Sequence, residues 1–144
     1  MIVAGAAATG ATTMAGLALG ARQTPTPWAP FDATSHIAWG EDAKQHTRLD
    51  AKHTLVGLAL NAGAMFVWAG VHALLGGRTR SIPAQIASAA GVSAIAYAVD
   101  YHAVPARLTP GFEKRLNRRA VGAMFVVLAG ALAIGGYAAN ALRG

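Results

Sequence analysis

The chain has 144 residues, of which 54% are hydrophobic and 12% are charged, and its formal net charge is +6. Because soluble domains carry about 25% charged residues, this composition favours a membrane protein over a soluble enzyme. Cysteine is absent, which excludes disulfides, thiolate catalysis and iron–sulfur clusters ligated by this chain.

Four apolar segments are long enough to cross a bilayer, which takes roughly 20 helical residues. Backbone groups in lipid must pair internally, so such long segments are expected to be helices. The predicted fold class is therefore all-α, an integral membrane bundle of four transmembrane helices in a single domain, residues 1–144. We expect the first segment to be a span rather than a cleaved secretory signal, because no basic residues precede it. The spans cover about residues 2–21, 54–76, 82–104 and 120–142.

Lysine and arginine are distributed unequally between the two sides of this bundle. Nine of the 12 lie in the loops 22–53 and 105–119. The positive-inside rule then predicts a bacterial inner-membrane protein with these loops in the cytoplasm and both termini in the periplasm. The basic charge is explained by topology, so no nucleic-acid partner is expected. The expected partner is the bilayer itself, with anionic headgroups bound by Lys114, Arg115, Arg118 and Arg119.

Small residues recur every fourth position in three of the spans, which permits close helix packing in lipid. This pattern predicts a compact bundle, with the alternative that one stripe faces another protein in a homo-oligomer or a larger membrane complex. The short connection between the second and third spans makes them an antiparallel pair. The stripes are Ala8, Thr12, Gly16 and Gly20; Ala90, Ala94 and Ala98; and Ala131, Gly135 and Ala139.

The first cytoplasmic loop begins with a proline-rich stretch, after which Asp32 is predicted to cap a short amphipathic helix that ends at Gly40. Phe31, Ile37 and Trp39 would place its apolar side in the headgroup region.

After Gly40, acidic and histidine side chains recur at helical spacing, which predicts that they share one face of a helix leading into the second span. They are Asp42, His46, Asp50 and His53. Such a stripe can bind a divalent metal, but we interpret it as solvated acid–base pairs. His53 and His102 could form an axial pair for haem, but the small packed residues around them offer no haem pocket. No cofactor is therefore predicted.

Asp100 lies about one turn from the cytoplasmic end of the third span. We predict that it pairs with a ring of cations at that depth and so holds the helix ends together. The alternative is a role in proton or substrate binding. Asn61, inside the second span, is predicted to hydrogen-bond across helices. The expected cations are Arg22, Lys52, Arg107, Arg118 and Arg119.

After Asp100 the chain reads Pro105, Arg107, Leu108, Thr109, Pro110, Gly111, Phe112 and Glu113, and the first loop carries Ser35, His36, Trp39 and Gly40. This arrangement resembles a family of small four-helix bacterial inner-membrane proteins to which no activity is assigned. The resemblance implies a topology but no reaction.

The function predicted from the sequence is that of a non-catalytic structural or accessory protein of the bacterial inner membrane. One alternative is a small transporter or proton-conducting protein that uses Asp100, with His53, His102 and Asn61. A second alternative is a metal- or haem-binding redox subunit that uses His46, Asp50, His53 and His102. The candidate polar cluster comprises Asp100, His102, Arg107, Thr109, Glu113, His53, His36 and Trp39.

Overall fold

The computed structural model describes residues 1–143, and these are mostly helical, with no strand among them. Four helical segments are long and apolar enough to cross a membrane, which confirms the predicted fold class and agrees with the predicted spans to within a few residues. They are α1, Ile2–Gln23; α4, Val56–Leu75, which continues the π-helical turn Ala51–Leu55; α5, Ile82–Ala98, continued by the π-helical turn Val99–Ala103; and α6, Arg118–Ala141.

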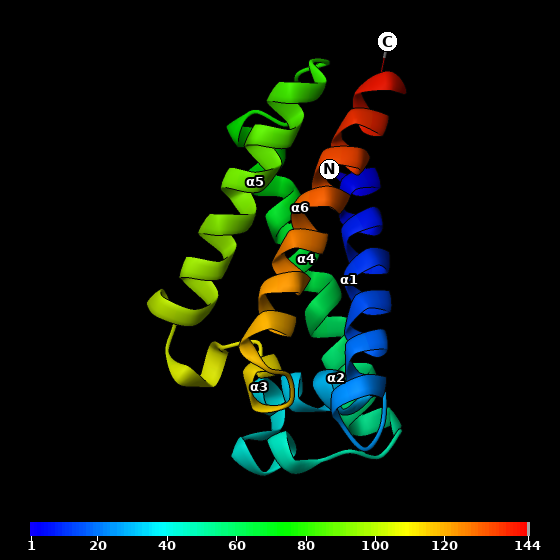
Figure 1. Ribbon diagram of the computed structural model, residues 1–144, viewed down its shortest axis with the longest axis vertical. Coiled ribbons are helices and arrows are strands. Elements are labelled where there is room, and N and C mark those ends of the chain that lie inside the picture. Colours follow the sequence, from blue (N-terminus) through cyan, green and yellow to red (C-terminus); the bar gives the residue numbers. More distant parts are fainter. Residues whose placement is uncertain (144) are drawn as a thin grey trace.

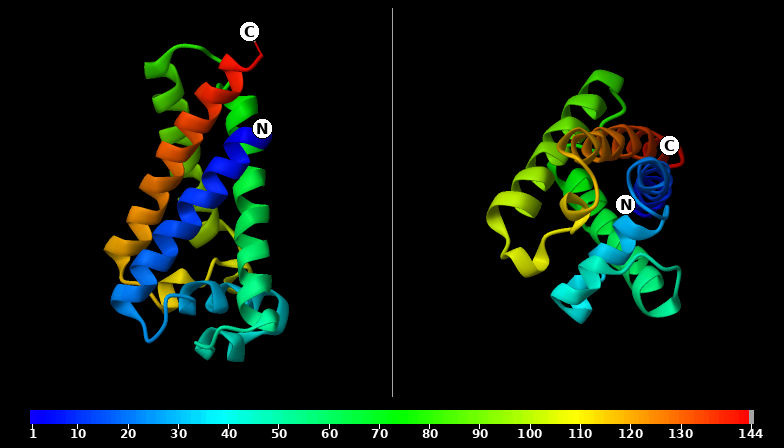
Figure 2. Two further views of the ribbon diagram at one scale, coloured as in Figure 1. Left: turned by 90° about the vertical axis from the view of Figure 1, so that its right-hand side faces the viewer. Right: turned by 60° about the horizontal axis from the view of Figure 1, so that its bottom comes forward.

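The four helices form an elongated bundle (Figure 1). Both termini and the connection from α4 to α5 lie at one end, and the two longer loops lie at the other, here called the loop end (Figures 1 and 2). Although a short connection joins α4 to α5, α5 packs more extensively against α6. Towards the loop end, α5 inclines away from the other helices.

Helices α1 and α6 make the most extensive contact in the bundle, through the small residues that the sequence places on both. Ala8, Gly16 and Gly135 are all buried. A Cβ atom added at Gly135 would lie 2.6 Å from the Cα atom of Ala4, so the two backbones approach too closely for a larger residue. Both stripes are buried, as predicted, but Gly16 and Gly20 of α1 lie against Phe31 and Pro27 of the first loop.

The small residues predicted to pack on α5 do not face the bundle. Ala90, Ala94 and Ala98 are exposed, whereas the buried face of α5 includes Ala89 and Ala96. The prediction was wrong because the helix is rich in small residues on several sides, so spacing alone does not identify the packed side. This outward face stays available to lipid or to another protein.

The first loop folds into α2, Ala29–Thr34, and α3, His36–Trp39, beneath the bundle (Figure 1). Asp32 is not the predicted N-cap, because the helix already begins at Ala29, where Pro30 occupies the first turn and leaves Asp32 buried inside it. Phe31 was also predicted wrongly. Its ring is buried against Phe112, in edge-to-face contact at 5.8 Å, rather than in the headgroup region.

The predicted helical stripe from Asp42 to His53 does not form. The segment Glu41–Gln45 is a short 3₁₀ helix, the chain is then non-helical to Asp50, and the next helix starts at Ala51. Asp50 caps that helix, since its side chain accepts a hydrogen bond from the His53 backbone N–H at 2.6 Å.

Candidate functional site

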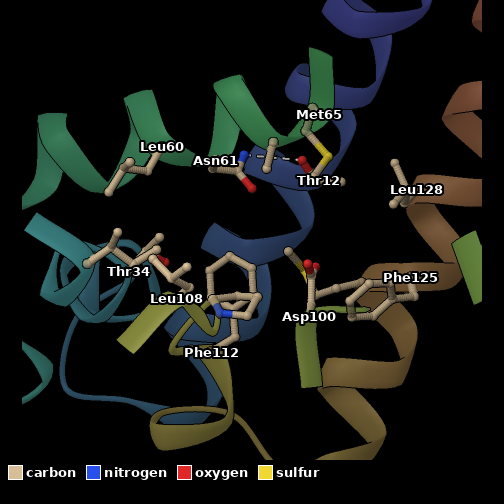
Figure 3. A pocket seen from close by; sticks show the side chains of 14 residues that line it. Thr12, Thr34, Leu60, Asn61, Met65, Asp100, Leu108, Phe112, Phe125 and Leu128 are labelled. Atoms are coloured by element: carbon tan, nitrogen blue, oxygen red, sulfur yellow. Dashed lines mark hydrogen bonds between the residues drawn. The ribbon is translucent and has the colours of Figure 1, made fainter. Parts of the chain in front are cut away.

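A partly open cavity of about 120 Å³ lies in the loop-end half of the bundle. Helices α1, α4 and α6 contribute its walls, and Asp100 lines it from the end of α5 (Figure 3). Most of the lining is apolar, and the polar side chains that reach it include Thr12, Asn61 and Asp100. It is therefore an apolar chamber with a carboxyl group and a carboxamide in its walls.

Asp100 makes no ion pair and no hydrogen bond through its side chain with any part of the chain that the structure describes. The predicted pairing with a ring of cations is therefore wrong. Asp100 sits on a π-helical turn beside the cavity, whereas Arg107, Arg118 and Arg119 are exposed at the surface. The acid and the cations lie at the same end of the bundle, but Asp100 borders the cavity while these arginines face outwards.

Asn61 joins α4 to α1 across the cavity wall. Its Nδ2 atom donates to the hydroxyl of Thr12 at 3.3 Å (Figure 3) and to that of Thr13 at 3.4 Å. The prediction that Asn61 hydrogen-bonds between helices is confirmed. These bonds satisfy a polar group that lipid could not satisfy and fix the amide beside the cavity.

The loop-end boundary of the cavity is built where the two sequence elements that carry the family resemblance meet. Gly111 has a φ of 83°, and a Cβ atom there would lie 2.9 Å from the carbonyl oxygen of Ala33. Only glycine permits both this backbone conformation and this approach. His36 is buried at the same contact, and its Nδ1 atom donates to the Ala33 carbonyl at 2.7 Å. Phe112 lines the cavity directly above.

The other residues of the predicted polar cluster lie outside the cavity. Thr109 donates to the Ala106 carbonyl at 2.9 Å and lies 3.5 Å from a Glu113 carboxylate oxygen, so it stabilises its own turn. The indole N–H of Trp39 donates to the Lys52 carbonyl at 2.8 Å, and the Lys52 ammonium lies 5.3 Å from the centre of that ring.

The two histidines of the proposed haem pair are not brought together. The exposed His102 packs its ring against Tyr97 at 5.6 Å between centroids. His53 instead contacts Asp50 and His46 on the first loop. No arrangement within residues 1–143 places these two rings on either side of one pocket.

The basic residues predicted to bind headgroups lie at the loop end. Lys114, Arg118 and Arg119 are exposed, and Arg115 is half-buried with two guanidinium nitrogens that have no partner in the described chain. Their exposure leaves them free to contact lipid phosphates, which stays a prediction.

A second polar layer lies at the opposite end, and the sequence reasoning missed it. The side-chain amides of Gln85 and Asn140 each donate to the carbonyl oxygens of Gly77 and Thr79, at 2.7 to 2.9 Å. They hold the α4–α5 connection against α5 and α6. His72 is buried beside Gln85. An amide side chain within an apolar span is the signal that could have located this layer.

Together the fold and this cavity define an all-α, multi-pass membrane protein with a partly open, mostly apolar cavity. Comparisons with protein-family models, with curated protein sequences and with solved structures found no match to this chain.

Proposed function

We propose that this chain is a non-catalytic accessory protein of a bacterial inner membrane that binds a small cationic amphiphile in the cavity beside Asp100. One observation carries this proposal: Asp100 has no partner, although it borders an apolar chamber inside a membrane bundle. Ionisable groups in such places are costly, and they usually mark a ligand or ion site.

The dimensions and lining of the cavity support this class of ligand. A volume of about 120 Å³ is similar to that of an engineered cavity of about 150 Å³ that binds benzene. A ring or short alkyl chain would contact Met65, Phe125 and Leu128, while an attached ammonium group would pair with Asp100. The amide of Asn61 adds one polar contact.

The structure offers less support for the transporter or proton-conducting alternative. Between the cavity and the polar layer at the opposite end lies a buried apolar cluster that includes Trp68, Val92 and Leu132. A proton or solute path would need polar groups or water through this layer. Binding from one side therefore fits the described conformation better than conduction.

The accessory role is supported by the outward face of α5, where the small side chains of Ala90, Ala94 and Ala98 are exposed. Small residues of this kind let a second transmembrane helix approach closely, either from another copy or from a larger complex. If this face binds a helix, Ala94→Leu should lower the apparent mass in mild detergent, whereas Ala18→Leu on an exposed position of α1 should not.

The ligand proposal is tested with benzylammonium and its uncharged analogue toluene as probes of the purified protein in detergent. We expect benzylammonium to raise the melting temperature of the wild type more than toluene does, and Asp100→Asn to abolish that difference. Asp42→Asn, an exposed acid on the first loop, is the control and should leave the difference intact. An equal response of the wild type and Asp100→Asn to benzylammonium would refute the proposal.

A further inference from the structure

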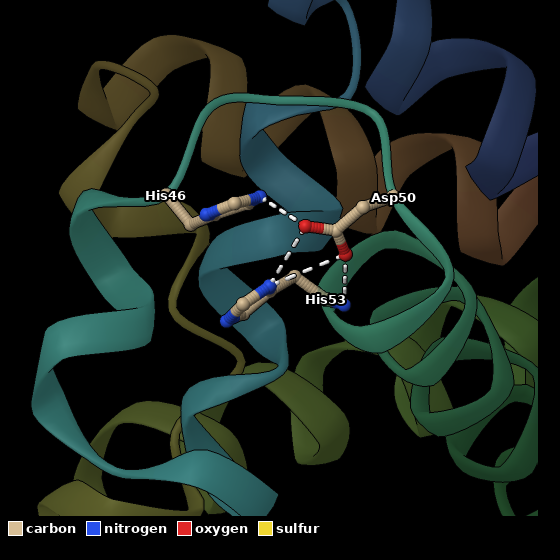
Figure 4. Close-up of side chains that lie close together, drawn as sticks. All are labelled: His46, Asp50 and His53. Atoms are coloured by element: carbon tan, nitrogen blue, oxygen red, sulfur yellow. Dashed lines mark hydrogen bonds and ion pairs between the residues drawn. The ribbon is translucent and has the colours of Figure 1, made fainter.

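Three side chains from separate parts of the first loop converge beside α4. His46 follows the 3₁₀ helix Glu41–Gln45, Asp50 is the N-cap of the next helix, and His53 lies in that helix's first turn. His46 Nε2 lies 2.7 Å from Asp50 Oδ2, and His53 Nδ1 lies 3.1 Å from the same oxygen (Figure 4). All three donor atoms lie within 4.8 Å of one another.

The three groups are held in place by contacts around them. The rings of His46 and His53 stack with their centroids 3.8 Å apart and their planes inclined by 20°. The Asp50 side chain is fixed by its helix cap, at 2.6 Å from the His53 backbone N–H. The Asp50 backbone N–H donates in turn to the Thr54 hydroxyl at 3.2 Å. These contacts bring the three groups together, and the two stacked rings would turn out of their parallel arrangement to direct both nitrogens at one ion. The members of the cluster are half-buried, so solvent can reach them.

A second carboxyl group, that of Asp32, lies behind the cluster and is fully buried. The hydroxyl of Thr54 donates to its Oδ1 atom at 2.5 Å, whereas its Oδ2 atom has no hydrogen-bond partner. Burial raises the pKa of Asp32, while the bond from Thr54 and the nearby imidazoles of His46 and His53 oppose that rise. Through the Thr54 hydroxyl this buried carboxyl is linked to the backbone of Asp50, so hydrogen bonds fix the chain behind the two histidines.

We propose that His46, Asp50 and His53 form a binding site for a divalent transition metal, with zinc as the best fit. Two imidazole nitrogens and one carboxylate oxygen are the protein ligands of zinc sites that keep one position open. Ligand atoms around a tetrahedral zinc ion are about 3.3 Å apart, given bonds of about 2.0 to 2.1 Å. The contacts at 2.7 and 3.1 Å would need to lengthen by well under 1 Å.

The fourth position has a candidate from the protein itself. The carbonyl oxygen of Arg48 lies 2.9 Å from His46 Nε2, on the non-helical segment between the two histidines. Either this oxygen or a water molecule could complete the coordination. This site lies on the loop outside the bundle and does not line the Asp100 cavity, so it stands independently of the proposed ligand.

The test uses the full-length protein in detergent, purified with a histidine-free tag, stripped with a chelator and titrated with Co²⁺. We expect one Co²⁺ per chain with the visible absorption of a four-coordinate site, displaced by one equivalent of Zn²⁺. His46→Ala and His53→Ala should each weaken binding by at least about tenfold, because each removes a direct ligand, a larger change than the loss of an outer-shell partner. His102→Ala, an exposed histidine at the same end of the bundle, is the matched control and should bind as the wild type does.

Asp50→Asn is the second variant, because asparagine keeps the helix cap while it removes the charged ligand. It should fold normally and also lose Co²⁺ affinity. The proposal is overturned if the wild type binds no stoichiometric Co²⁺, or if the His46 and His53 variants bind it unchanged. If the wild type binds no Co²⁺ and His46→Ala nevertheless lowers its melting temperature, the cluster is an ion-pair network and the proposal is overturned.

Discussion

Asp100 and Asp50 are both acids at the loop end, but their surroundings are opposite. Asp50 accepts hydrogen bonds from its own helix and contacts two imidazoles, and the bond from the His53 backbone N–H is the main cause that lowers its pKa to about 2. Asp100 has no such partner in the described chain and borders an apolar cavity. Equivalent substitutions at the two positions should therefore have different effects.

We expect Asp100→Asn to leave the free energy of unfolding unchanged or to raise it by up to about 1 kcal/mol, because it removes an unpaired carboxyl group from an apolar setting at nearly constant volume. Thermal or denaturant unfolding in detergent measures this. Asp50→Ala is the contrasting variant, and loss of its helix cap should cost about 1 kcal/mol. Marked destabilisation by Asp100→Asn that is relieved when Arg107 is also neutralised would restore the ion-pair interpretation.

At the scale of helices, the packing of α1 against α6 depends on the close approach of the two backbones. Gly135 lies directly against Ala4, whereas a Cβ atom at Gly130, on the same helix, would meet nothing within 4 Å. The two glycines thus separate the effect of close packing from the effect of helix propensity.

Gly135→Ala should lower the free energy of unfolding by about 1 to 3 kcal/mol, as overpacking does in a tight interface. Gly130→Ala should be neutral or slightly stabilising, since alanine favours the helix by roughly 0.5 to 1 kcal/mol over glycine. Unfolding of both variants in the same detergent measures the difference. If the two variants have equal free energies of unfolding, α1 and α6 are not closely packed at Gly135 in the detergent-solubilised protein.

For the whole molecule, the unequal distribution of lysine and arginine predicts which end faces the cytoplasm. Two exposed, uncharged residues lie at opposite ends of the bundle and can report its orientation. Ser81 lies in the α4–α5 connection, and Ala106 lies in the loop after α5. In intact cells whose outer membrane has been made permeable, Ser81→Cys should react with a membrane-impermeant thiol reagent. Ala106→Cys should react only after the inner membrane is opened, and the reverse pattern would invert the proposed orientation without changing the four spans.

The amino-acid sequence by itself determined the four spans, the all-α class and the buried stripes of small residues on α1 and α6. These features follow from composition along one continuous segment, because a long apolar stretch in lipid has the helix as its available structure. The role of Asn61 was also predictable, since an amide inside a span must find a partner.

The tertiary structure decided which side of each element faces the interior. Helix α5 carries small residues on several sides, so spacing did not reveal that Ala90, Ala94 and Ala98 point outwards. His46, Asp50 and His53 do come together, but through a cap and a non-helical segment rather than along the predicted helix. Asp100 lies beside a cavity rather than a cation because α5 inclines away from α4 and ends in a π-helical turn. The positions of α5 and Asp100 depend on contacts between segments distant in the sequence, which local spacing does not encode. The histidine cluster depends instead on where the helix begins, and its cap at Asp50 set that point.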